Sequence, residues 1–137
     1  MVELVDYSIS YGECVGYCMS MLTIDGLSIE LSQMSNGADK SERRFTGKIE
    51  AGLRQRIVQE AARLEHGNLS EVYGTPDARD EGAVTIRTRG PGGVTEHRYS
   101  RGDPPREFAA LDALLSPILV GWVDGEASPG VHFNDAP

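Results

Sequence analysis

Cysteine is scarce in this sequence, which holds only Cys14 and Cys18. Long apolar runs are absent as well, since none approaches the ~20 residues that a helix needs to cross a bilayer. The first residues, MVELVDYS, are acidic and alternating, whereas a secretory signal begins basic and then becomes apolar. We therefore expect a cytoplasmic protein, and in that compartment the two cysteines are expected to be free thiols.

Positive charge is the second shortage. The chain has 13 lysines and arginines against 21 aspartates and glutamates, which gives a net charge of −8. This excess repels phosphate backbones and anionic lipid headgroups, so we expect neither a nucleic acid nor a membrane as partner. The same charge favours another protein with a basic surface as the partner.

The length and hydrophobic content are those of a single domain. The 137 residues are 39% hydrophobic, enough to form one core. We expect one α+β domain over residues 1–123. Residues 124–137 form an acidic tail that contains proline and glycine, and we expect this tail to be ordered only if it docks on the domain.

Alternation of apolar and polar residues predicts strands in the first part of the chain. Residues 5–11 alternate strictly, and residues 17–24 and 27–34 continue the pattern. The Asp25-Gly26 pair between the last two suits a two-residue hairpin loop, because both central residues of such a loop need positive φ. A fourth, shorter strand is expected near residues 43–49.

The expected hairpin fixes which side chains share a face. A loop at Asp25-Gly26 would place Ile24 opposite Leu27 on the buried face, and Cys18 would point toward the core with them. Met19 and Met21 would then fall on the other face. We take these two methionines as candidate residues for binding a protein partner.

The middle of the chain predicts a helix and then a second hairpin. Apolar residues recur at helical spacing from residue 50 to 66. The turn-forming GPGG at 90–93 lies between two alternating runs. The expected pairing places Arg87 opposite Glu96 on one surface and turns His97 toward the core.

A second helix is expected after Asp103, which would act as N-cap with two prolines following it. Pro117 is expected to kink this helix or to end it early. The predicted order is therefore ββββαββα. It describes an α+β fold with an antiparallel sheet, built from two β-hairpins plus flanking strands, and two helices packed on one face.

The cysteine turn admits three interpretations. A metal site could use Cys14 and Cys18, but zinc usually takes four ligands and a second cysteine pair is missing. A redox or hydrolytic enzyme could use Cys14 with His97 as base and an acid such as Asp6, provided that the two hairpins adjoin. We favour the third interpretation, an architectural turn with no metal, cofactor or catalytic residue.

Arginines gather near the second hairpin. Arg87 and Arg89 lie there, and such a basic surface on an acidic protein could bind a carboxylate or a phosphate. The plainer alternative is that Arg87 pairs with Glu96 across the two strands. We keep both arginines as candidate binding residues.

The run GECVGYC at residues 12–18, followed by an alternating strand and an Asp-Gly turn, resembles the start of an uncharacterised bacterial family of unknown function. The signature of that family is Cys-x-Gly-x-Cys-Pro. The order of the later helix, hairpin and final helix is similar too, so the resemblance covers roughly residues 5–119. This chain departs from the family at Met19, which is usually proline, and at Met21, where an aromatic residue is common. Because the family has no assigned activity, the resemblance implies a fold and no chemistry.

The composition and motifs together favour a non-catalytic protein-interaction domain. The immunity proteins that neutralise bacterial toxins are one example of this physical type, being small, acidic and without a catalytic set. The alternatives are an enzyme centred on Cys14 and a metal-binding module that uses Cys14 and Cys18.

Overall fold

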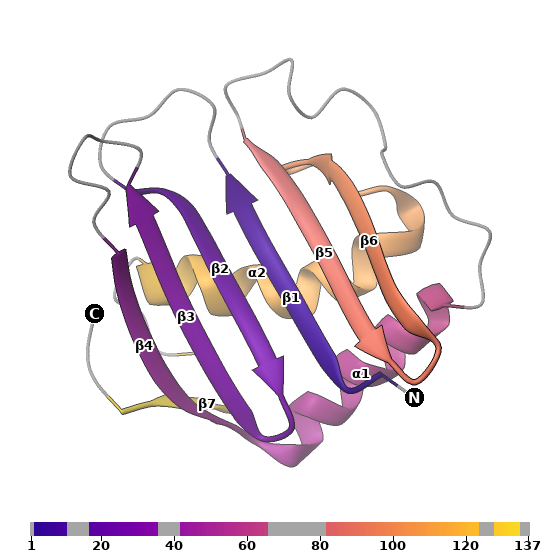
Figure 1. The fold of residues 1–137 in the computed structure, drawn as a ribbon, viewed down its shortest axis with the longest axis horizontal. Coiled ribbons are helices and arrows are strands. Elements are labelled where there is room, and N and C mark those ends of the chain that lie inside the picture. The colour runs from indigo at the N-terminus through magenta and orange to yellow at the C-terminus, as the bar shows by residue number, and fades with distance from the viewer. Residues whose placement is uncertain (1, 11–16, 36–41, 66–81, 124–127, 135–137) are drawn as a thin grey trace.

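The computed structural model describes residues 2–10, 17–35, 42–65, 82–123 and 128–134. The strands of these residues form one 7-stranded sheet, and Figure 1 shows the long helices behind it. Every pair of neighbouring strands is antiparallel, and the strand order is β6-β5-β1-β2-β3-β4-β7. The predicted α+β class and order of elements are therefore confirmed, with one short strand added at the end.

The elements follow the chain in the order that the alternation and the helical periodicity predict. Their bounds are β1 Leu4–Ser10, β2 Tyr17–Asp25, β3 Ser28–Ser35, β4 Glu42–Ile49, α1 Ala51–Glu65, β5 Ala83–Gly90, β6 Gly93–Ser100, the 3-10 turn η2 Arg106–Phe108, α2 Ala109–Val123 and β7 Val131–Phe133.

Strand β1 lies between the two hairpins and joins them into one sheet. Its residue Tyr7 is opposite Leu22 of β2 on one side and Ile86 of β5 on the other. The first hairpin, the second hairpin and β1 therefore share the same two faces.

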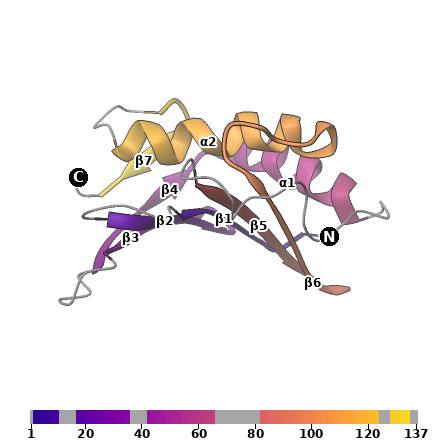
Figure 2. The ribbon, with the colours of Figure 1, turned by 90° about the horizontal axis from the view of Figure 1, so that it is seen from above.

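Both helices cover one face of this sheet, as the view from above in Figure 2 shows. The buried strand residues and the buried helix residues form one hydrophobic cluster. From α1 the cluster takes Ile57, Ala61 and Leu64, and from η2 and α2 it takes Phe108, Leu111, Leu115, Ile118, Leu119 and Trp122. Burial of apolar surface in this cluster, at ~25 cal/mol per Å² removed from water, supplies most of the free energy that favours folding.

The turn between β2 and β3 differs from the predicted one by one residue. Asp25 is opposite Ser28, so the loop consists of Gly26 and Leu27. Gly26 has φ +62°, which the first central residue of this kind of turn requires. Leu27, which the prediction placed opposite Ile24 on the buried face, is instead 53% exposed.

The second hairpin has the predicted register. Arg87 is opposite Glu96, and Ile86 is opposite His97. His97 is 7% exposed, which confirms that it faces the core.

The second helix starts later and runs further than predicted. Asp103 does not cap it; the preceding turn η2 begins after Pro105 and has no side-chain cap. Pro117 lies inside α2, which continues to Val123. Burial of Ile118, Leu119 and Trp122 beyond the proline stabilises this last part of the helix, so the prediction of an early end is wrong.

The edge of the sheet next to β4 also differs from the prediction. β4 has eight residues, as many as β3, and is therefore not the shorter strand that was expected. Beyond it, β7 pairs with Gly47–Ile49, and its Val131 belongs to the hydrophobic core. Part of the C-terminal tail therefore docks as a strand.

Candidate functional site

One face of the sheet carries no helix of the described residues, and we call it the open face. In β1 and β3, half-buried residues on this face alternate with fully buried ones on the helical face. An antiparallel sheet tolerates this arrangement, because one of its faces can remain in water. The open face includes Asp6, Ser8, Met19, Met21, Thr23, Glu30, Ser32, Met34, Glu42, Arg44, Arg87, Arg89, Glu96 and Arg98.

Three methionines meet on the open face over β2 and β3. Met19 is directly opposite Met34, and Met21 follows Met19 by two residues on the same strand. All three are half-buried. We call Met19, Met21 and Met34 the methionine cluster. Flexible thioether side chains adapt to the shape of whatever covers them, which is why methionine is frequent on protein-binding surfaces.

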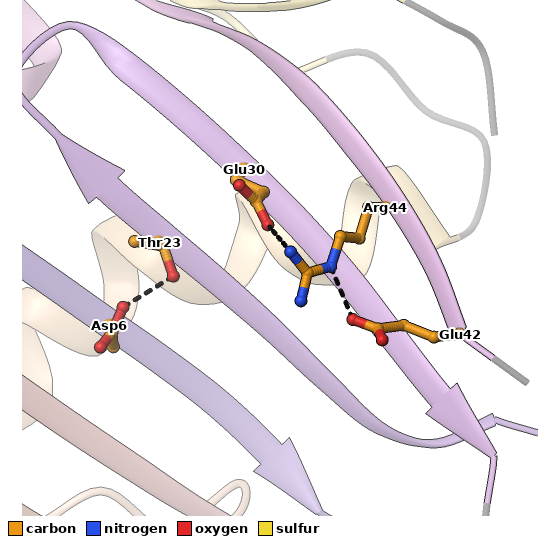
Figure 3. Close-up of polar contacts among 5 residues, drawn as sticks. All are labelled: Asp6, Thr23, Glu30, Glu42 and Arg44. Atoms are coloured by element: carbon orange, nitrogen blue, oxygen red, sulfur yellow. Dashed lines mark hydrogen bonds and ion pairs between the residues drawn. The ribbon is translucent and has the colours of Figure 1, made fainter. Parts of the chain in front are cut away.

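Charged side chains flank this cluster on β3 and β4. The guanidinium of Arg44 lies between two carboxylates, with Nε 2.7 Å from Glu42 Oε1 and Nη1 3.6 Å from Glu30 Oε1 (Figure 3). The hydrogen bond from Arg44 to Glu42 raises the pKa of the arginine further above its usual range. The side chain of Arg44 remains 66% exposed, and such ion pairs in water contribute little to stability. Another cation could therefore replace Arg44 at these carboxylates.

Hydroxyl groups lie on the other side of the cluster, over β1 and β2. Thr23 Oγ1 donates a hydrogen bond to Asp6 Oδ1 at 2.7 Å, as Figure 3 shows. Ser8 is opposite Met21. The open face thus combines apolar contact area with small polar groups.

The candidate residues Arg87 and Arg89 share the open face with Met19 and Met21. Both arginines are exposed on β5, and Asp6 of β1 is opposite Arg87. Arg87 Nε lies 3.9 Å from Glu96 Oε1, so the cross-strand ion pair predicted as the alternative is present. The sequence suggested these two pairs of candidate residues separately, and β1 brings them onto one surface.

The remaining candidates lie elsewhere. Cys14 and the side chain of Cys18 are outside the described residues, so the interpretation of the cysteine turn is not tested. His97 packs on the helical face with its ring 5.0 Å from that of Phe108. Asp6 lies on the open face, on the opposite side of the sheet, and this excludes Asp6 as an acid that orients His97. Among the described residues no group of three or more metal-ligating side chains comes together.

A buried polar contact holds the helical layer against the sheet. Asp112 Oδ2 of α2 accepts hydrogen bonds from the Tyr7 hydroxyl at 3.1 Å and the Tyr99 hydroxyl at 2.5 Å. Burial, followed by the nearby Asp112 charge, raises the pKa of Tyr7 far above its usual value. For Tyr99 the pKa is raised by burial and by the hydrogen bond to Asp112. Both phenols therefore stay neutral, which suits a structural role.

A second polar group lies under the C-terminal end of α2. Arg43 Nη2 donates to Gln33 Oε1, and Gln33 Nε2 donates to Ser20 Oγ at 3.4 Å. The guanidinium carbon of Arg43 is 5.8 Å from the ring centre of Phe45 and 5.9 Å from that of Trp122. These contacts join β2, β3 and β4 to the helix through hydrogen bonds and cation–π attraction.

Sequence reasoning missed Met34 and the ion pairs of Arg44. Met34 follows from the predicted alternation of residues 27–34, which places every second residue from Ser28 to Met34 on the face away from the core. The pairing of Arg44 with Glu30 had no comparable signal, because it depends on the register between β3 and β4.

Comparison with known proteins adds no relatives. No family model matches the chain, and no curated protein matches it. The resemblance of residues 12–18 to an uncharacterised bacterial family therefore stays a prediction. The helices among the described residues are too short or too polar for any of them to cross a bilayer.

Proposed function

We propose that this protein is a non-catalytic interaction module that binds another protein through the open face. The observation that carries the proposal is the methionine cluster, a group of three half-buried apolar side chains on a sheet face that no described helix covers. A partner that packed on these side chains would remove their remaining surface from water, at about 25 cal/mol per Å².

The partner that fits best is a protein with a basic surface around an apolar patch. The net charge of −8 attracts such a protein from a distance and raises its rate of association. Close to the methionine cluster, Glu30 and Glu42 pair with the exposed Arg44. A lysine or arginine of the partner could displace Arg44 there and complete the contact.

An inhibitor of the immunity type is a specific form of this proposal. Such a protein is small and acidic, and it acts by covering a basic surface of a toxin rather than by chemistry. The charge of the chain and the methionine cluster support this form, in which the toxin would be the basic partner.

The test compares capture of a partner by two variants of the same chain. Met21→Lys places a charge in the methionine cluster, while Leu27→Ala truncates an apolar residue that is 53% exposed at the β2–β3 turn, outside the cluster. Proteins retained from a lysate at low salt are identified by mass spectrometry, purified and titrated calorimetrically against both variants and the wild type.

The proposal predicts a basic protein whose affinity falls at least about tenfold with Met21→Lys, as for a central interface residue. Leu27→Ala should leave the affinity within about twofold, and added salt should slow association. The proposal is wrong if no retained protein depends on Met21, or if the retained protein is acidic and binds both variants equally. Circular dichroism of Met21→Lys checks that the fold is intact.

A further inference from the structure

The two edges of the sheet differ in how they are covered. At one edge the short strand β7 covers Gly47–Ile49 of β4. At the other edge β6 pairs with β5 on one side, and no strand of the described residues lies on its other side. An unpaired edge strand is a template for another chain, and proteins usually block it with proline, a bulge or inward-pointing charge.

Strand β6 has neither a proline nor a bulge. Its sequence GVTEHRYS has no proline, and its pairing with β5 continues without a register shift from Gly93 to Ser100. Its two charged residues, Glu96 and Arg98, lie on the open face and have opposite sign. The strand is therefore long, regular and able to pair.

Hydrogen-bonded and non-hydrogen-bonded residue pairs alternate along β5 and β6, and this alternation shows which backbone groups of β6 face outward. The two-residue loop at Pro91-Gly92 makes Gly90 and Gly93 a hydrogen-bonded pair, and every second pair after it is of the same kind. The hydrogen bond from Arg101 N to Gly82 O, 3.1 Å long, agrees with this alternation, because it continues the series of hydrogen-bonded pairs just beyond the far end of the strand. Val94, Glu96, Arg98 and Ser100 therefore direct their N–H and C=O groups away from β5.

These outward groups permit one antiparallel register in which two copies of β6 complement each other. When the two-fold axis passes through His97, Glu96 of each copy is directly opposite Arg98 of the other. A shift by one hydrogen-bonded pair in either direction would place Glu96 opposite Glu96, or Arg98 opposite Arg98. Like charges directly opposite each other are destabilising, so only the first register has favourable charge pairing.

We propose that this protein forms a dimer in which β6 pairs antiparallel with β6 of a second copy, in the register that places Glu96 opposite Arg98. The pairing uses about eight backbone hydrogen bonds, two for each hydrogen-bonded pair. It extends one sheet across both copies and keeps their open faces on the same side. The inference is independent of the proposed function, because the edge of β6 is distinct from the methionine cluster.

The test uses two variants, each of which reverses one of the two charges. Glu96→Arg alone would place arginines opposite arginines, and Arg98→Glu alone would place glutamates opposite glutamates. Sedimentation velocity at low salt, over a wide range of concentration, measures association of each variant alone and of an equimolar mixture. In the mixture every arginine can face a glutamate.

The proposal predicts a concentration-dependent dimer for the wild type and at least about tenfold weaker association for each variant alone. The mixture should associate about as well as the wild type. Glu96→Pro, which removes an outward N–H without removing a bond to β5, should abolish the dimer, and circular dichroism checks its fold. The proposal is overturned by a wild type that is monomeric throughout, or by a dimer that neither charge reversal weakens. Met21→Lys should leave the dimer unchanged, and loss of the dimer in that variant would place the contact on the open face instead.

Discussion

Asp112 accepts hydrogen bonds from two tyrosines that belong to different strands, Tyr7 of β1 and Tyr99 of β6. Strand β5 lies between these two strands. A single carboxylate of α2 therefore links two strands that are not neighbours in the sheet. Each phenol is almost fully buried. Buried polar groups require partners, and here the carboxylate and the phenols satisfy one another.

The raised pKa values of both tyrosines predict a loss of stability at alkaline pH. Below about pH 10 the phenols are neutral in the folded and the unfolded states, and their contribution is fully present. Above about pH 10 the unfolded chain ionises first, so the free energy of unfolding should decline as pH rises. Urea denaturation from about pH 8 to pH 11 measures this decline.

Tyr99→Phe should lower the free energy of unfolding by about 1–2 kcal/mol near pH 8, because Asp112 loses one donor. The decline above pH 10 should then be shallower than in the wild type, since one phenol with a raised pKa has been removed. Equal slopes for the variant and the wild type would contradict the assignment of this pH dependence to Tyr99.

Gly47 is required by close contact between two strands. A Cβ at this residue would overlap the backbone carbonyl oxygen of His132 and lie 2.7 Å from Cα of Phe133. Gly47→Ala should therefore displace β7 and cost about 1–3 kcal/mol. Gly52→Ala is the matched control, because nothing lies within 4 Å of its Cβ, and it should be neutral or slightly stabilising. Thermal denaturation and hydrogen exchange of residues 131–133 compare the two, and unchanged exchange in Gly47→Ala would contradict the overlap.

At the scale of the element, alternation and helical periodicity predicted that β1 to β6, α1 and α2 exist and in what order they follow, while their ends required tertiary contacts. The turn lies at Gly26-Leu27, with Gly26 at positive φ as the first central residue, so Asp25 stays in the strand. The helical periodicity of apolar residues extends through Ile118 and Leu119, and both are buried. It could not show that their burial would outweigh the helix-breaking effect of Pro117.

Pro117 lies in the interior of α2 and removes one helical hydrogen bond. Pro117→Ala should therefore raise the free energy of unfolding by about 1–3 kcal/mol. Ala113→Gly, at an exposed residue of the same helix, should lower it by about 1 kcal/mol and serves as the control for helix propensity. Chemical denaturation measures both, and a less stable Pro117→Ala would mean that the proline shapes the helix to fit the sheet.

At the scale of the whole molecule, the candidate site depends on β1. Each hairpin could be predicted to carry outward residues, Met19 and Met21 on one and Arg87 and Arg89 on the other. That all four share one face could not be predicted, because it requires β1 to pair with β2 and with β5, which is distant in sequence. The docking of β7 could not be predicted either, since three residues with one buried valine give too weak a pattern of alternation.

Docking of β7 predicts that the C-terminal segment contributes to folding. Val131 is 6% exposed, Glu50 N donates to Gly130 O at 2.7 Å, and Asn134 N donates to Thr46 O at 2.9 Å. A chain that ends at residue 127 should lose about 3 kcal/mol of stability, from one buried valine and these backbone hydrogen bonds. A chain that ends at Asn134 is the control and should match the wild type in urea denaturation. Equal stability of both shortened chains would contradict this role of β7.

The central place of β1 also has a consequence for synthesis of the chain. When β1, β2 and β3 have left the ribosome, β1 can pair with β2, but its other edge has to wait for β5. Residues 36–90 must be translated in between, which takes on the order of several seconds. During that interval a regular strand rich in apolar side chains is open on one side, so the nascent protein is most exposed to mispairing and most in need of a chaperone before its second hairpin emerges.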